Sequence, residues 1–76
     1  MSHVFTVQIS GIKDKDHYED ALFAAGCDDA LFAEVDGVTY LDFDREADTF
    51  EDAVKSASRD IERTGAKVIR VMPKPE

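Results

Sequence analysis

The chain has few of the residues on which the chemistry of most small enzymes depends. Its 76 residues include one cysteine, Cys27, and no asparagine or tryptophan. A lone thiol cannot form an intramolecular disulfide or a two-cysteine metal site, and it is typical of proteins of the reducing cytoplasm. The lack of asparagine excludes the arginine–asparagine phosphate site of acylphosphatases. The four glycines are isolated, which excludes a glycine-rich phosphate loop.

Long apolar runs are also missing. No run approaches the ~20 apolar residues of a membrane span, and the N-terminus lacks the basic-then-apolar pattern of a secretory signal. We therefore expect a cytoplasmic protein that does not enter membranes. The length predicts a single domain over residues 1–76, in which residues 73–76 form a frayed tail.

The charge is acidic and unevenly distributed. The net charge is −8, with fourteen acids and three bases from Lys13 to Asp52, but six bases and three acids from Ala53 to Glu76. Such a field repels nucleic acid and attracts basic surfaces. Acids that only keep a small protein soluble would give the same net charge, so charge alone does not decide the function.

Alternating and continuous apolar runs predict four strands. The pair Asp36-Gly37 lies between two of these runs, and this dipeptide is the one typical of a two-residue hairpin turn. In the run that follows it, Thr39, Leu41 and Phe43 share one face, and Tyr40, Asp42 and Asp44 lie on the other. The expected strands are 3–10, 30–35, 38–44 and 66–72.

Helical spacing and capping residues predict two helices between these strands. The first helix begins at Asp14 or Asp16 and ends at Gly26, which supplies a left-handed C-terminal residue. The second helix begins at Thr49, the first residue of a capping-box pattern, and ends at Gly65.

The order strand–helix–strand, hairpin, helix–strand predicts an α+β fold of the ferredoxin-like βαββαβ (split βαβ) kind. Right-handed crossovers then give an antiparallel sheet in the order 4-1-3-2, with both helices on one face. The expected core consists of Phe5, Val7, Ile9, Leu22, Leu41, Phe43, Val54, Ala57 and Ile61.

The residues do not indicate an enzyme. A cysteine nucleophile needs a histidine partner, but both histidines, His3 and His17, lie near the N-terminus, and Cys27 follows a helix end. We interpret Cys27 as a small buried apolar residue and His17 as an exposed helix residue. No cofactor and no metal are expected.

The bare face of the predicted sheet does not indicate RNA binding. That use of this topology requires aromatic residues on the central strands, flanked by lysine and arginine. Here the third strand offers Tyr40 beside the carboxylates of Asp42 and Asp44. We therefore expect no direct contact with nucleic acid.

Carboxylates gather at the start of both predicted helices and around the second and third strands. Capping explains the helix starts, and protection of an exposed edge strand is the alternative explanation for the others. Neither explains Asp42 and Asp44 well, because both point outward from the middle of a strand. A row of carboxylates can imitate the phosphates of nucleic acid. The candidate partner-binding residues are Asp28, Asp29, Glu34, Asp36, Asp42, Asp44, Glu46 and Asp48.

Three segments resemble a known kind of module. AGCDDA (25–30), DGVTYLDFDREA (36–47) and FEDAVKSASRDIERTGAKVIRVMP (50–73) are similar to the N-terminal module of small bacterial helix-turn-helix regulatory proteins. In those proteins a DNA-binding segment follows the module; because this chain stops at Glu76, we do not carry DNA binding over. By size, charge and expected fold, the chain also looks like the small acidic anti-CRISPR proteins that phages direct against type I systems.

The sequence therefore leads to a non-enzymatic binding protein, and two functions stay open. One is a monomeric nucleic-acid mimic of the anti-CRISPR kind, which blocks DNA binding by a basic subunit of a CRISPR effector. The other is a regulatory or antitoxin-like module that pairs with a protein partner, or with itself, through its edge strands or open sheet.

Overall fold

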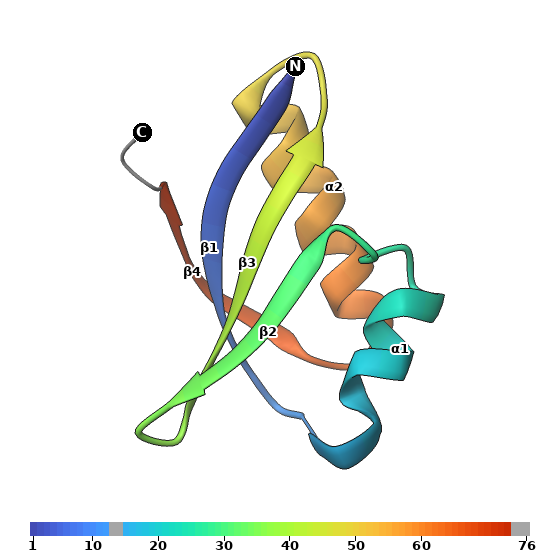
Figure 1. Ribbon diagram of the computed structural model, residues 1–76, viewed down its shortest axis with the longest axis vertical. Helices are drawn as coiled ribbons and strands as arrows, with labels where there is room; N and C mark the ends of the chain where they lie inside the picture. The colour runs from blue at the N-terminus through green and yellow to red at the C-terminus, as the bar shows by residue number, and fades with distance from the viewer. Residues whose placement is uncertain (13–14, 74–76) are drawn as a thin grey trace.

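A computed structural model describes residues 1–12 and 15–73 of the chain. It has the α+β, ferredoxin-like arrangement that the sequence predicts: an open antiparallel sheet of four strands with two helices (Figure 1). The elements are β1 (Ser2–Ser10), the 3-10 helix η1 (Lys15–His17), α1 (Tyr18–Ala24), β2 (Ala30–Val35), β3 (Val38–Glu46), α2 (Phe50–Arg63) and β4 (Lys67–Pro73).

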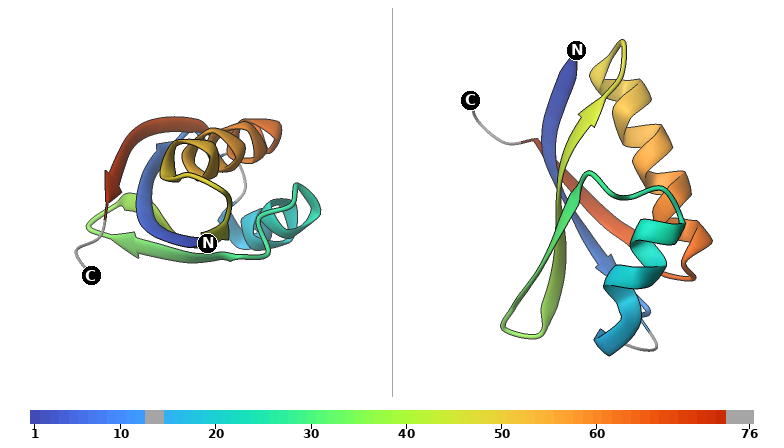
Figure 2. Two further views of the ribbon diagram at one scale, coloured as in Figure 1. Left: turned by 90° about the horizontal axis from the view of Figure 1, so that it is seen from above. Right: turned by 45° about the vertical axis from the view of Figure 1, so that its right-hand side comes forward.

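The strand order β2-β3-β1-β4 confirms the predicted topology, and every neighbouring pair is antiparallel. Both helices lie on the same side of the sheet, so no described element covers its other face (Figure 2). We call this uncovered side the open face. β2 and β4 are the edge strands.

The core lies between the sheet and the helices. The rings of Phe5 and Phe43 stack at its centre, with their centroids 5.3 Å apart. All but one of the expected core residues are buried; Val54 is only partly buried against the cluster. Cys27 is buried, as interpreted from the sequence, whereas the expected core did not include the buried side chains of Tyr18, Thr39, Ala53 and Ala66.

The first helix starts differently from the expectation. Asp14 lies outside the described residues, and Asp16 belongs to η1 and not to the cap. The residue at the helix start is His17, and its side chain makes no capping hydrogen bond. The far end is as expected: Gly26 has a φ of +100°, and the amide of Cys27 donates to the Leu22 carbonyl over 2.9 Å.

The hairpin turn and the second helix cap are confirmed. Asp36 and Gly37 have φ values of +53° and +78°, as a two-residue type I′ turn requires. The Thr49 hydroxyl accepts a hydrogen bond from the Asp52 amide over 3.1 Å at the start of α2. The turn also fixes the register of β2 on β3, beginning with Val35 opposite Val38.

The side chain of Arg45 is buried on the helix side of the sheet, beside the buried carboxylate of Asp60, and it uses all five of its N–H groups. Two bond the carboxylate of Asp29, over 2.8 and 3.0 Å. Two more bond Asp60 over 3.0 Å and the Ser56 hydroxyl over 3.2 Å. The last bonds the Gly26 carbonyl over 3.2 Å. These bonds join β3, α2 and the loop between α1 and β2. We call this set the Arg45 network.

The packing around the Arg45 network is close. The guanidinium carbon lies 5.1 Å from the centroid of the Phe43 ring, within the range of a cation–π contact. A Cβ atom added to Gly26 would lie 3.3 Å from the nearer oxygen of Asp60. Gly26 therefore serves both the helix end and the approach of the loop to α2. Hydrogen bonds to Asp29, together with the neighbouring charges, raise the pKa of Arg45 further above its usual range.

We expect the Arg45→Ala substitution to lower the free energy of unfolding by about 3–5 kcal/mol, because it leaves the carboxylates of Asp29 and Asp60 without their cation. That is a large share of the about 4–11 kcal/mol available to a chain of this length. Urea denaturation would measure the loss. Arg45→Lys should rescue little, since one ammonium cannot replace a five-donor fork. Arg59→Ala, on the exposed side of α2, is the control and should change stability by less than about 0.5 kcal/mol. A loss below about 1 kcal/mol for Arg45→Ala would show that the network is not needed.

Candidate binding surface

The two central strands supply the middle of the open face. Residues opposite each other in an antiparallel pair point to the same side, so the register places Val4 beside Asp44 and Thr6 beside Asp42. The Thr6 hydroxyl donates to an Asp42 carboxylate oxygen over 2.6 Å. Val4 is 47% exposed although it lies on a central strand. The predicted outward direction of Asp42 and Asp44 is thereby confirmed.

The edge strand β2 adds apolar side chains to this face. Leu31, Ala33 and Val35 pair with Asp42, Tyr40 and Val38, so they lie on the open face. Leu31 is 74% exposed and Val35 is 56% exposed. The sequence reasoning concentrated on the acids of this strand and missed its apolar contribution.

The other edge strand, β4, brings cations to the open face. Met72, Arg70 and Lys67 lie opposite Thr6, Gln8 and Ser10. The register shifts between Gln8 and Ile9, and Arg70 and Lys67 are both exposed. The open face therefore has exposed apolar side chains on β2 and at Val4, acids on β3 and bases on β4.

The candidate acids from the sequence do not all lie on this face. Asp29 is held by Arg45 and its side chain is only 25% exposed. Glu34 pairs with the buried Thr39, which places it on the helix side of the sheet. Asp36 occupies the hairpin turn. Of the expected acidic flank, Asp42, Asp44 and Glu46 of β3 thus lie on the open face, and Asp29, Glu34 and Asp36 lie elsewhere.

Glu46 is the last residue of β3 and lies opposite Ser2 at the rim of the open face. Glu46 forms an ion pair with the N-terminal amine and accepts a hydrogen bond from the Ser2 hydroxyl over 3.0 Å. These two hydrogen bonds are the main reason that the pKa of Glu46 is lowered. Asp28 and Asp48 are exposed in the loops before β2 and α2.

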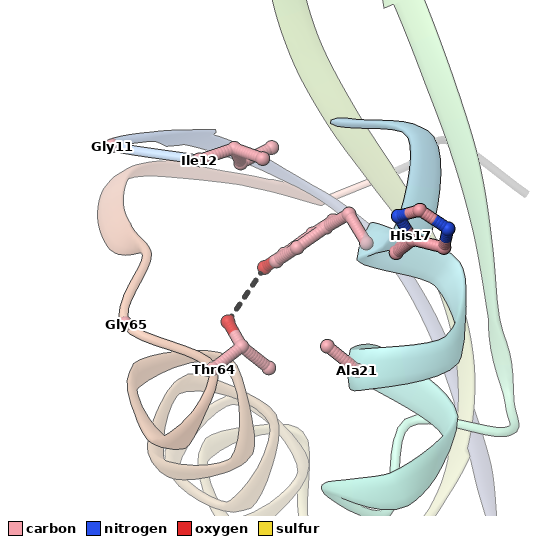
Figure 3. Close-up of a pocket in the computed structure, with 7 residues that line it drawn as sticks. Gly11, Ile12, His17, Ala21, Thr64 and Gly65 are labelled. Carbon is pink, nitrogen blue, oxygen red and sulfur yellow. Dashed lines mark hydrogen bonds between the residues drawn. The ribbon is translucent and has the colours of Figure 1, made fainter. Parts of the chain in front are cut away.

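A hollow of about 300 Å³ opens between α1 and the end of α2 (Figure 3). In it the hydroxyls of Tyr18 and Thr64 lie 2.8 Å apart. Because Thr64 donates its own proton to the Ile61 carbonyl over 2.6 Å, Tyr18 is the donor. Burial raises the pKa of Tyr18. His17 lines the hollow and is exposed, and the two hydroxyls inside it bond to each other.

The described part of the chain offers little else for catalysis or metal binding. It contains no group of three or more histidine, cysteine, aspartate or glutamate side chains that could hold a metal ion. Nor does it contain a helix with the length and apolar character that crossing a bilayer requires. Cys27 is 3% exposed, and burial raises the pKa of its thiol to about 11. The open face is the surface with the clearest capacity to bind.

We expect the Cys27 thiol to react with a thiol reagent at least about a hundredfold more slowly in the native protein than in denaturant, because thiolate is the reactive species and burial suppresses it. Absorbance during labelling at pH 8 would measure the rates. The raised pKa means that the folded state favours the protonated thiol. The stability that the buried, protonated Cys27 thiol contributes is therefore fully present below the unfolded pKa, near 9, and is lost as the pH rises towards about 11. Fast native labelling at pH 8 would show an accessible, activated thiol.

Comparison with known proteins gives no relative from which to transfer a function. No protein-family model matches the chain, no curated protein matches it, and no solved structure matches it. The function must therefore be argued from the surface itself.

Proposed function

We propose that this protein is a non-enzymatic binding module that associates with a protein partner through its open face. The observation that carries the proposal is the exposure of apolar side chains over an uncovered sheet. Leu31, Val35 and Val4 are 74%, 56% and 47% exposed, and they share one face. The register places Asp42 and Asp44 of β3 between Leu31 and Val4, so the exposed apolar side chains are set among polar ones on this face. Exposed apolar side chains rimmed by polar residues are typical of a protein–protein interface.

The charges of the open face favour a protein over a nucleic acid as partner. Asp42 and Asp44 lie on a central strand, where they would repel a phosphate backbone. Tyr40, the aromatic residue that the central strands place on the open face, is only partly exposed, so it offers a base little surface to stack on. Together these features support the regulatory or antitoxin-like role proposed from the sequence.

A second candidate is the nucleic-acid mimic of the anti-CRISPR kind, acting on a basic effector subunit. The observation in its favour is that several candidate acids are exposed outside the open face. Asp28, Asp36 and Asp48 are all exposed, and the net charge of the chain is −8. Binding of this kind depends on charge and should weaken steeply as salt is added.

We expect a Val4→Ser, Leu31→Ser double variant to lose at least about tenfold in partner retention, because the apolar anchors of an interface carry most of its binding energy. The measurement is affinity capture from extracts of the producing cells, quantified at low and at high salt. Retention by the unchanged protein should persist at high salt, since burial of apolar surface does not depend on ion pairing.

The matched control is Phe23→Ser. Phe23 is 70% exposed, close to the value for Leu31, but it belongs to α1 on the other side of the sheet. It should retain the partner. If the control and the double variant lose the partner equally, the open face is not the site. Circular dichroism of each variant separates lost binding from lost folding.

We expect an Asp28→Asn, Asp36→Asn, Asp48→Asn triple variant to keep its partner at both salt concentrations. Asparagine tolerates the positive φ of position 36, so the hairpin turn survives the change. The same capture assay provides the measurement, with the Val4→Ser, Leu31→Ser variant as the reference for lost binding. Loss of the partner in the triple variant, together with loss at high salt in the unchanged protein, would favour the nucleic-acid mimic instead.

A further inference from the structure

We infer that the partner of the open face is a second copy of this chain, which packs face to face in a two-fold dimer. This inference rests on the proposed function of the open face. It departs from the monomer that the sequence led us to expect. The reason is the way in which charge is arranged on the face.

The acids and bases of the open face lie towards opposite ends of the strands. Asp44 and Asp42 are near the end of β3, at the levels of Val4 and Thr6 on β1. The bases are near the start of β4: Arg70 is level with Gln8, and Lys67 with Ser10. β1 is antiparallel to both β3 and β4, so β3 and β4 run in the same direction, as Figure 1 shows. The face therefore has one acidic end and one basic end.

Two copies related by a two-fold axis would pair these opposite charges, if the axis lies in the plane of the face between its acidic and basic ends. Rotation about that axis places the acidic end of each copy over the basic end of the other. Asp44 of one copy then faces the Arg70 and Lys67 side of its partner, and the same contact occurs a second time by symmetry. A single surface can thus be complementary to itself, although the whole chain carries a net charge of −8.

Between Asp44 and Lys67, the middle of the face carries apolar side chains beside Asp42 and Arg70. Tyr40 on β3 and Met72 on β4 are partly exposed, and Leu31 on β2 is largely exposed. Two sheets that pack face to face lie about 10 Å apart, and the side chains of their inner faces fill the space between them. A second copy would bury this middle without burying the hairpin turn or the acids in the loops.

The charged side chains that would pair across the dimer have no ion pair within residues 1–12 and 15–73. This holds for Asp44, Arg70 and Lys67, all of which are exposed. Asp42, in contrast, already accepts a hydrogen bond from Thr6. The test therefore uses Asp44 and Arg70.

The experiment is a charge-swap series measured by sedimentation equilibrium over a wide range of protein concentration. We expect Asp44→Lys and Arg70→Glu each to raise the dimer dissociation constant about tenfold or more, because each puts like charges opposite each other at both symmetric contacts. The double variant keeps the net charge and restores an opposite-charge pair. Its dissociation constant should return to within about threefold of the original.

Two controls match these changes in net charge at positions outside the open face. Asp28→Lys changes the net charge as Asp44→Lys does, and Arg59→Glu changes it as Arg70→Glu does; both residues are exposed, Asp28 in the loop before β2 and Arg59 on α2. Asp28→Lys lowers the overall repulsion between two acidic chains, so it should leave the dimer unchanged or strengthen it. Weakening by Asp44→Lys alone would show that the effect is local.

The outcomes separate this inference from the proposed function. An unchanged chain that stays monomeric up to about 1 mM, or a double variant no better than its parents, overturns the second copy as partner. If the Val4→Ser, Leu31→Ser variant still loses a captured protein in that case, the open face binds a different protein and the proposed function stands. If neither self-association nor capture depends on the open face, both fail.

Discussion

The position of the edge strand β2 depends on one buried cation. Arg45 projects from β3 towards α2 and donates hydrogen bonds to the loop that leads into β2, at the Asp29 carboxylate and the Gly26 carbonyl. A 76-residue chain has a small core, and neither a disulfide nor a metal ion within the described residues helps to hold its layers together. The Arg45 guanidinium helps to hold the layers together, because its rigid group of five donors can form hydrogen bonds to the loop and to α2 at the same time.

Such a network contributes more to specificity than to net stability. Moving an arginine and two carboxylates out of water costs nearly as much as their attraction returns, so a well-packed apolar cluster would stabilise the fold as well. An apolar cluster would not select one arrangement of the loop, whereas five directed hydrogen bonds do. The network also removes Asp29 and Asp60 from the surface, where a count of charges would have placed them.

Sequence periodicity was enough to predict the fold, and it also indicates the buried Arg45 network. Alternation, the Asp36-Gly37 turn and the Thr49 cap predicted the strands, the hairpin and α2, because each reflects a local preference. The predicted start of α1 was wrong, because the 3-10 turn that precedes the helix has no distinct sequence pattern. The burial of Arg45 was not predicted, because the predicted third strand ended at Asp44. When that strand is extended by one residue, Arg45 falls in phase with the buried residues Leu41 and Phe43. Asp60 likewise follows Ala53 and Ala57 on the buried side of α2. A charge in phase with a core predicts a buried partner of opposite sign.

The candidate binding surface was harder to predict, because β2 is apolar on both sides. In Ala30–Val35, neither set of alternate residues is clearly polar, so periodicity cannot say which side meets the helices. The hairpin decides it: a two-residue turn sets Val35 opposite Val38, and this register sends Leu31 to the open face and Glu34 to the helix side. The uneven charge along the chain then takes on a spatial meaning. β3 lies in the acidic segment and β4 in the basic one, and the sheet places these two strands parallel to each other on either side of β1. Acids and bases that are separate in sequence become the two ends of one face. The relevant charge for binding is therefore that of the face, which is nearly balanced, and not that of the whole chain.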